Sequence, residues 1–301
     1  MSASMIFLNI IGSVALLLWG MGIVKRAVNK AYGASLRRLL LKCSRSNFKS
    51  AFAGVGVTLL LQSSTAVALI IASFTAKGLV TTPVALAMML GADIGTTIVA
   101  QILSFDFSWL VPVLLILGLV ISRTARSVRP KNTGSILLWL AVILLSLNML
   151  LGLSEPLRQS EELQRLLTVL SDEPFLAILI IGFLTWLSHS SLAMILMVAS
   201  FVSSGVIMMD LALLLVLGIN IGGMFPALIA SLPEGPGAKQ VTLGNAIYKW
   251  AVVLALMPFL GLIDPLLDKI ATDPAQKIVN FHTAISVLVF VIFIGTTKIM
   301  A

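Results

Sequence analysis

The chain is poor in charged residues. Only 11% of its 301 residues are Asp, Glu, Lys or Arg, whereas an average soluble domain carries about 25%. Hydrophobic residues make up 59% of the chain, and the mean hydropathy is +1.09. Several apolar stretches reach the roughly 20 residues that span a bilayer as a helix, and none shows the short alternating pattern of an outer-membrane barrel. The composition therefore predicts an all-α polytopic membrane protein.

Cysteine is almost absent as well. Cys43 is the only one, which excludes an intramolecular disulfide and argues against a cysteine-based metal site. We therefore expect no transition metal and no organic cofactor. The N-terminal segment, MSASMIFLNIIGSVALLLWGMGIVKR, also lacks the basic start and the small-residue cleavage site of a signal peptide. It is expected to remain as the first helix.

Acidic residues are missing from two basic connecting segments. Segment 25–49 contains eight Lys or Arg residues and segment 123–131 contains four. The positive-inside rule places both on the cytoplasmic side, the longer one partly as a helix lying in the interface. Segment 154–174 carries five acids against two arginines, so it is expected outside. The net charge of +8 thus reflects membrane topology, and no nucleic-acid partner is expected.

Nine apolar segments are expected, at residues 5–24, 51–76, 80–104, 107–122, 134–153, 175–204, 206–231, 242–263 and 279–297. Three of them separate two basic loops that face the same side, and an odd number of crossings cannot do this. One segment must enter the membrane and return, and 51–76 is the candidate because polar residues interrupt it. Such a re-entrant backbone needs cover from protein or a water-filled cavity. The chain is expected in the inner cell membrane with seven crossings, its N-terminus outside, and its C-terminus with Lys298 cytoplasmic.

The second half of the sequence repeats the first, with an offset of 127 residues that places Thr58 on Thr185. TLLLQSSTA (58–66) aligns with TWLSHSSLA (185–193), and GADIG (91–95) aligns with GINIG (218–222), without a gap. The expected topology gives the two copies opposite orientations, which is typical of secondary transporters. The predicted first repeat, 1–131, comprises a helix, hairpin 51–76, broken helix 80–104 and helix 107–122. The predicted second repeat, 132–263, comprises a helix, hairpin 175–204, broken helix 206–231 and helix 242–263. A C-terminal helix is expected in 264–301.

The hairpin tips predict an anion cradle. If the second half of the first hairpin begins at Ser63 or Ser64, free backbone N–H groups and the positive end of a helix dipole lie at the tip, with serine as a favoured cap. Ser190 and Ser191 would present the same groups from the opposite side of the membrane. Two such tips meeting near the midplane would bind an oxyanion without Lys or Arg.

The GADIGTT and GINIGG segments predict a cation site. Glycine pairs such as Gly91 and Gly95 tolerate unusual backbone conformations, so both helices are expected to unwind there. Their exposed carbonyl groups would suit Na⁺ together with the side-chain oxygens of Asp93, Thr96, Thr97 and Asn220. Asp93 is the only acid placed deep in a span, which makes it a functional candidate, although a structural hydrogen bond stays open.

Both histidines and the small residues also have plainer interpretations. His189 replaces Gln62 in the repeat, and its role is left open between polar packing, substrate contact and proton handling. His282 is expected to be structural. Ser, Thr and Gly often mediate tight packing of membrane helices, but the same pattern in both halves favours a site.

These motifs resemble the sodium-dependent phosphate cotransporters of the Na/Pi type, the animal type II carriers and their bacterial relatives, here without a PhoU-like C-terminal domain. The resemblance rests on Q-S-S-[S/T/N]-A followed by G-A-[N/D]-I-G-T-T, repeated inversely, and extends to GNAIYKW (244–250) and NFHTAIS (280–286). It implies that phosphate contacts Ser63, Ser64, Thr65, Ser190 and Ser191, with His189 as a further candidate. It likewise implies that Gln62, Asp93, Thr96, Thr97 and Asn220 hold Na⁺ or shape its site.

The predicted function is a secondary transporter that moves inorganic phosphate coupled to Na⁺ by alternating access. The alternatives are a phosphate exporter or exchanger without strict Na⁺ dependence and a carrier of sulfate or a carboxylate. An intramembrane hydrolase built from Ser63, Ser190 and His189 is a remote alternative, as is a channel, so no enzyme is expected. A homodimer stays open.

Overall fold

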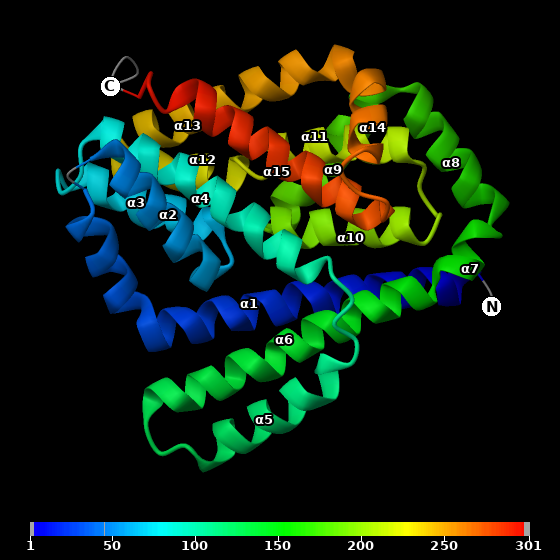
Figure 1. The fold of residues 1–301 in the computed structure, drawn as a ribbon, viewed down its shortest axis with the longest axis horizontal. Helices are drawn as coiled ribbons and strands as arrows, with labels where there is room; N and C mark the ends of the chain where they lie inside the picture. Colours follow the sequence, from blue (N-terminus) through cyan, green and yellow to red (C-terminus); the bar gives the residue numbers. More distant parts are fainter. Residues whose placement is uncertain (1–2, 45, 298–301) are drawn as a thin grey trace.

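The computed structural model describes residues 3–44 and 46–297, and within that part the secondary structure is all helical. The all-α prediction is confirmed, and Figure 1 shows most of the helices packed into one body, with α5 lying outside it. Six helical stretches are long and apolar enough to cross a membrane: Ser4–Lys42, Thr82–Leu103, Val128–Gly152, Met209–Glu234, Pro236–Asp268 and Pro274–Phe293. They correspond to α1, α4, α6, α11 with α12, α13 with α14, and α15. The predicted positions of Arg45 and Lys298 lie outside the described residues.

Two helix lengths differ from the prediction. α1 runs over Ala3–Lys42, so most of the expected loop 25–49 continues the first helix; Figure 1 shows it turning in its second half. Basic residues mark the cytoplasmic side, but Lys, Arg and Leu are good helix formers and do not end a helix. α5 (Leu110–Thr124) has only 15 residues, about 22 Å at the usual rise, so one of the seven predicted crossings falls short of a bilayer.

The two predicted hairpins are present, each as a pair of half-helices. The first comprises α2 (Asn47–Leu61) and α3 (Ser64–Ala76), and the second comprises α9 (Pro174–Ser188) and α10 (Ser191–Ser203). The chain reverses at Gln62 and at His189, both with φ of +52°, the only non-glycine residues with positive φ in residues 3–44 and 46–297. These two positions are 127 residues apart, as the sequence alignment predicts.

The expected unwinding of the GADIG segment is wrong. α4 runs unbroken over Thr82–Leu103, and its glycines serve helix packing instead. A Cβ atom on Gly91 would lie 1.9 Å from the carbonyl oxygen of Ala51, and one on Gly95 would lie 2.8 Å from that of Val55. These glycines therefore let α2 and α4 touch backbone to backbone.

The second repeat uses its glycines in the same way. A Cβ atom on Gly218 would lie 2.7 Å from the carbonyl oxygen of Ile178, and one on Gly222 would lie 2.1 Å from that of Gly182, so α9 and α11 (Met209–Gly222) pack like α2 and α4. An interruption does follow here, because α12 (Phe225–Ser231) starts after a short turn. The packing of the two halves thus repeats at the offset of 127 residues.

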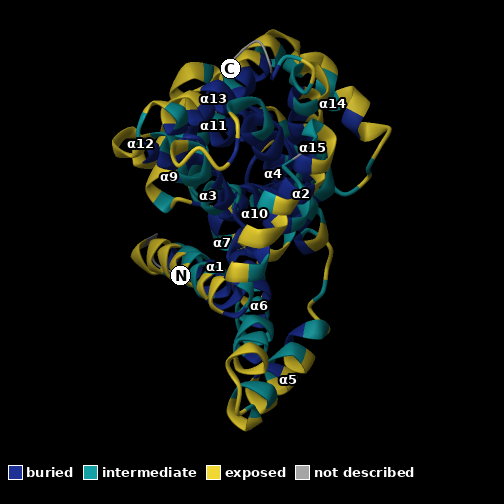
Figure 2. Cartoon of the chain, turned by 90° about the vertical axis from the view of Figure 1, so that its left-hand side faces the viewer, coloured by how far each residue is buried: buried dark blue, intermediate teal, exposed yellow. Residues whose placement is uncertain are grey.

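α4 and α11 form the centre of the molecule. Their most apolar windows are 78% and 72% buried, against 28% for α1 and 17% for α13 (Pro236–Leu256) with α14 (Leu260–Asp268). Figure 2 shows the buried residues concentrated around α4, α10 and α11, while α5 projects from the body alongside α6 (Val128–Gly152). The short helices α7 (Ser154–Arg158) and α8 (Glu161–Asp172) join α6 to the second hairpin. α15 (Pro274–Phe293) packs against both α4 and α10.

Two neighbouring glycines of α2 give a matched test of this packing. A Cβ atom on Gly54 would lie 2.1 Å from the carbonyl oxygen of Met88, whereas one on Gly56 would meet nothing within 4 Å. We expect Gly54→Ala to lower the free energy of unfolding by about 1–3 kcal/mol, because α2 and α4 must separate. Gly56→Ala should be neutral or slightly stabilising. Thermal unfolding in detergent micelles measures both, and equal melting temperatures would refute the backbone contact.

Candidate functional site

The structure brings the two hairpin tips together. A small recess, here called the tip recess, is lined by the following residues: Lys25, Gln62, Ser63, Ser64, Thr65, Thr96, His189, Ser190, Ser191 and Leu192. All six predicted substrate residues therefore border one space. Lys25, which the sequence placed in the cytoplasmic loop, also lines it, so the prediction of a cradle without Lys or Arg is wrong.

Each tip contains two consecutive serines, and the first differs from the second in its hydrogen bonding. The side-chain oxygen of Ser63 accepts a hydrogen bond from the Ala66 N–H at 3.3 Å, and that of Ser190 accepts one from the Ala193 N–H at 3.3 Å. These serines cap α3 and α10.

Ser64 and Ser191 follow them as the first residues of these helices and line the tip recess. Their hydroxyl groups have no hydrogen-bond partner in the described part of the chain. The hydroxyls of Ser64 and Ser191 are thus unpartnered among the described residues. Those of Ser63 and Ser190 instead accept a capping hydrogen bond, and the Ser190 O–H also lies 3.8 Å from Met21 Sδ.

A buried ion pair lies beside the tips. Lys249 Nζ of α13 is 2.9 Å from Asp93 Oδ1 of α4, and the two side chains are 8% and 6% exposed. Asn245 Nδ2 donates to Asp93 Oδ2 at 3.4 Å. A second recess, the ion-pair recess, contains both charged residues together with Ser64, Thr96, Ser191, Ile219, Asn220, Gly223 and His282. The two hairpin tips and the candidate cation site are therefore adjacent.

Sequence reasoning missed Lys249 as a site residue. The segment GNAIYKW supported the resemblance, but no role was drawn from its lysine. The available signal was a basic residue inside the apolar segment 242–263, because charged side chains in membrane spans are rare and mark functional sites.

Several buried polar atoms around Asp93 lack a partner. Asn220 Nδ2 lies 3.1 Å from His282 Nδ1 and donates to the Val216 carbonyl at 2.9 Å. Among the described residues, Asn220 Oδ1, Asn245 Oδ1 and His282 Nε2 have no hydrogen-bond partner, although these three residues are only 2–3% exposed. Buried polar atoms are nearly always satisfied, so these atoms leave hydrogen-bonding capacity beside Asp93 for a further polar group or ion. His282, expected to be only structural, borders the site.

The predicted cation residues do not form a single group. Asp93, Thr96 and Asn220 line the ion-pair recess, whereas Gln62 lines only the tip recess. Thr97 is fully buried, its hydroxyl donates to the Ile94 carbonyl at 2.8 Å, and it lines neither recess. The structure thus keeps three of the five predicted residues together.

A larger cavity of about 390 Å³ lies at the end of the bundle where α4 ends and α15 begins. It is lined by Leu103, Leu196 and polar residues that include Asp106 and Asp273. Hydrogen bonds from the side chain and backbone of Ser108 lower the pKa of Asp106, so this carboxylate stays charged at neutral pH.

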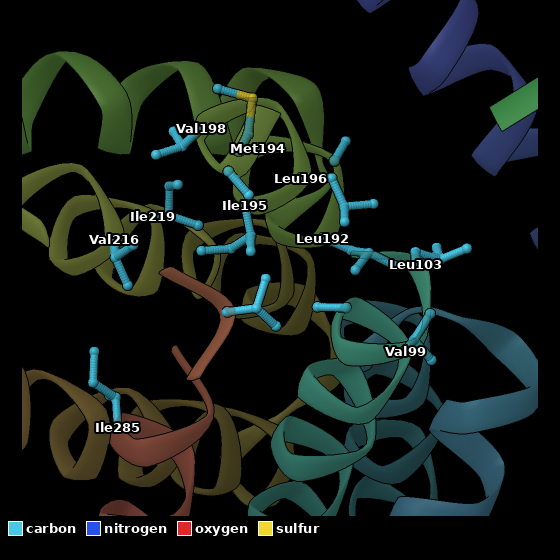
Figure 3. Close-up of a cluster of buried hydrophobic side chains, with 14 of the residues drawn as sticks. Val99, Leu103, Leu192, Met194, Ile195, Leu196, Val198, Val216, Ile219 and Ile285 are labelled. Carbon is cyan, nitrogen blue, oxygen red and sulfur yellow. The ribbon is translucent and has the colours of Figure 1, made fainter. Parts of the chain in front are cut away.

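An apolar plug separates the large cavity from the tip recess. Figure 3 shows Val99 and Leu103 of α4 beside Leu192 of α10, with Leu196 of the same helix nearby. Leu103 and Leu196 face the large cavity, whereas Leu192 lines the tip recess. All four side chains are at least 91% buried. Leu192 and Leu196, one helical turn apart on α10, thus lie between the two spaces.

Residues 16–151 and 154–294 match the family model described as "Na+/Pi-cotransporter". The chain belongs to this family. It is 34% identical over 275 residues to a protein of Escherichia coli K12 named "Putative inorganic phosphate export protein YjbB", covering 91% of this chain and 51% of that protein. The counterpart of Salmonella typhimurium is 32% identical over 294 residues, covering 98% and 54%. The chain thus spans about half the length of these relatives.

A further relative has a similar length. "Uncharacterized protein YqeW" of Bacillus subtilis is 28% identical over 296 residues, covering 98% of this chain and 96% of that protein. No solved structure matches the chain. The family assignment confirms the resemblance inferred from the tip and GADIG motifs, and the chain is a multi-pass membrane protein of this family.

Proposed function

We propose that this protein is a secondary carrier of inorganic phosphate that works by alternating access. The observation that carries the proposal is the meeting of two serine-capped helix N-termini, α3 and α10, in one recess. Helix N-termini bind phosphate through free N–H groups and the helix dipole, and Ser64 and Ser191 add hydroxyl donors. The family membership and the printed names of the YjbB relatives support the same substrate.

The proposed transport cycle rests on the repeated architecture. Repeats 1–131 and 132–263, of opposite topology, would rock about a site that stays near the midplane. The apolar plug of Val99, Leu103, Leu192 and Leu196 would be the closed gate on the outer side, since the large cavity lies at the end of α6 that precedes the acidic segment 154–174. The N-terminus would lie outside and the C-terminus in the cytoplasm of the inner membrane.

The coupling ion is proposed to be Na⁺, held near Asp93 and Asn220. Hard oxygen ligands suit this ion, and the unpartnered side-chain oxygens of Asn220 and Asn245 border the carboxylate. The second candidate is a phosphate exporter or exchanger that does not require Na⁺, favoured by the export function in the names of the YjbB relatives.

The geometry gives little support to a hydrolase. Nucleophilic catalysis requires a base within hydrogen-bond reach of the nucleophile. His189 Nδ1 instead lies 3.1 Å from the Leu187 carbonyl oxygen, and Ser190 Oγ accepts from the Ala193 N–H. No hydrogen bond joins His189 to either tip serine among the described residues.

The test is the flux of radiolabelled phosphate across proteoliposomes containing the purified full chain, with Na⁺, K⁺ and proton gradients compared in parallel. We expect phosphate flux that Na⁺ accelerates and that excess unlabelled phosphate suppresses more strongly than sulfate or a carboxylate. Phosphate flux that ignores Na⁺ would favour the exporter or exchanger. Folded protein that carries sulfate or a carboxylate instead of phosphate would overturn the proposal.

A further inference from the structure

The buried pair of Lys249 and Asp93 lies where both transported ions would bind. Its charged atoms are 2.9 Å apart at the ion-pair recess, which Ser64 and Ser191 of the two tips also border. An ammonium group has three donors, and in the described part of the chain the ion pair with Asp93 is the polar contact of Lys249. Lys249 therefore has hydrogen-bonding capacity left for a ligand in the recess.

Asp93 likewise has neighbouring side-chain oxygens that lack a hydrogen-bond partner among the described residues. Asn245 donates its Nδ2 to the carboxylate, which leaves Asn245 Oδ1 without a partner, and Asn220 Oδ1 is also unpartnered. Both amides are 2% exposed, and Asp93 borders the recesses that contain them. A carboxylate with two amide oxygens is a ligand set for a monovalent cation, provided that the ammonium of Lys249 moves away.

The charge balance links these two observations. With Lys249 on Asp93 the pair is neutral, and a charge buried without a partner is costly. An oxyanion alone would leave excess negative charge in the recess, and a cation alone would leave excess positive charge. Binding both allows two new pairs to replace the original one, so that neither charged side chain is left unpaired.

We propose that Lys249 exchanges partners during transport and thereby couples the oxyanion to the cation. When both ligands bind, the ammonium turns from Asp93 to the oxyanion held by Ser64 and Ser191, and Asp93 with Asn220 and Asn245 holds a monovalent cation. Lys249 is then both an oxyanion-binding residue and an internal competitor of the cation. This inference rests on the proposed phosphate-carrier function.

Reciprocal effects follow from this exchange, because a coupling free energy acts equally on both ligands. Asp93→Asn releases Lys249, so phosphate should bind at least tenfold more tightly without a cation, and the cation should no longer improve its affinity. Lys249→Gln releases Asp93, so a cation should bind more tightly without phosphate, while phosphate binding weakens. Lys249→Arg retains the pair and should retain the coupling.

The experiment measures equilibrium binding to the purified full chain. Binding of radiolabelled phosphate is first titrated at fixed pH in the presence of either Na⁺ or choline. It is then titrated in choline at a series of pH values. The first series tests Na⁺ as the coupled cation, and the second tests a proton. Binding of ²²Na⁺ without phosphate is the second readout. The neutral double variant Asp93→Asn/Lys249→Gln controls for folding, and each variant is compared by its melting temperature.

The outcomes separate two failures. If wild-type protein binds phosphate with cation dependence and Asp93→Asn keeps that dependence, the exchange is overturned while the carrier function stands. This is the result expected for a static ion pair. If Na⁺ is the wild-type cation, unchanged ²²Na⁺ affinity in Lys249→Gln would overturn the exchange as well. If folded wild-type protein binds no phosphate with any cation, the proposed function fails and the inference fails with it.

Discussion

Lys249→Met is expected to lower the free energy of unfolding by about 3–5 kcal/mol, the usual loss when one partner of a buried ion pair is removed. The substitution leaves Asp93, whose side chain is 6% exposed, with Asn245 Nδ2 as its remaining donor in the described part of the chain. At about 2–4 °C per kcal/mol for a domain of 150–250 residues, the melting temperature in detergent should fall by roughly 6–20 °C.

The substitutions of Asp93 and Lys249 are expected to lower stability by different amounts. Asp93→Asn should be tolerated better than Lys249→Met, because the released ammonium borders the same recess as Asn220, whose side-chain oxygen lacks a partner among the described residues. The double variant Asp93→Asn/Lys249→Met should recover part of the loss, since no unpaired charge remains.

Lys277→Met is the matched control. It breaks the ion pair with Asp268, in which the side chains of Lys277 and Asp268 are 15% and 58% exposed. Since water reaches the carboxylate, the loss should be about 1 kcal/mol. Equal melting temperatures for Lys249→Met and Lys277→Met would show that the buried pair contributes no more than a partly exposed one.

The second large effect concerns the tips. Ser64→Ala and Ser191→Ala are each expected to raise the Kd for phosphate by about 10- to 100-fold, because a hydrogen bond to a charged group contributes about 1.5–3 kcal/mol. The melting temperature should not change, since neither hydroxyl has a hydrogen-bond partner in the described residues. Phosphate binding and thermal unfolding of the same preparations measure both quantities.

The preceding serines provide the comparison. Ser63→Ala and Ser190→Ala remove helix caps, so each should lower stability by about 1 kcal/mol as well as weaken phosphate binding. Ser63→Asn should restore the cap, because Asn is an equally good capping residue. If Ser64→Ala leaves phosphate affinity unchanged while Ser63→Ala abolishes it, the division of roles between the two serines is wrong.

Much of the architecture could be predicted from the sequence because it follows local rules. Apolar length predicted the spans, and the polar interruption predicted a helix start at Ser63 or Ser64. In the structure α3 begins at Ser64 and α10 begins at the equivalent Ser191. The repeat predicted that Gln62 and His189 occupy equivalent positions, and both have φ of +52°. Each of these features depends on a few neighbouring residues, so a single sequence is enough to indicate it.

The composition of the site depended on contacts between distant segments. Gly91 was expected to unwind α4, but whether a glycine unwinds a helix or admits a neighbour depends on what packs against it, here Ala51 of α2. Thr97 was grouped with Asp93 by its position in GADIGTT, yet its side chain lies away from both recesses.

The sequence by itself determined the class of the protein, its family, the break of each hairpin and the serines at the tips. Only the tertiary structure decided that Lys249 of α13 pairs with Asp93 of α4, that Gln62 stays with the tips, and that apolar side chains of α4 and α10 lie between the tip recess and the large cavity. The physical reason is that helix capping and apolar length act within a few residues. The pairing of charges instead depends on which helix faces pack together, and backbone contacts at glycines set that packing.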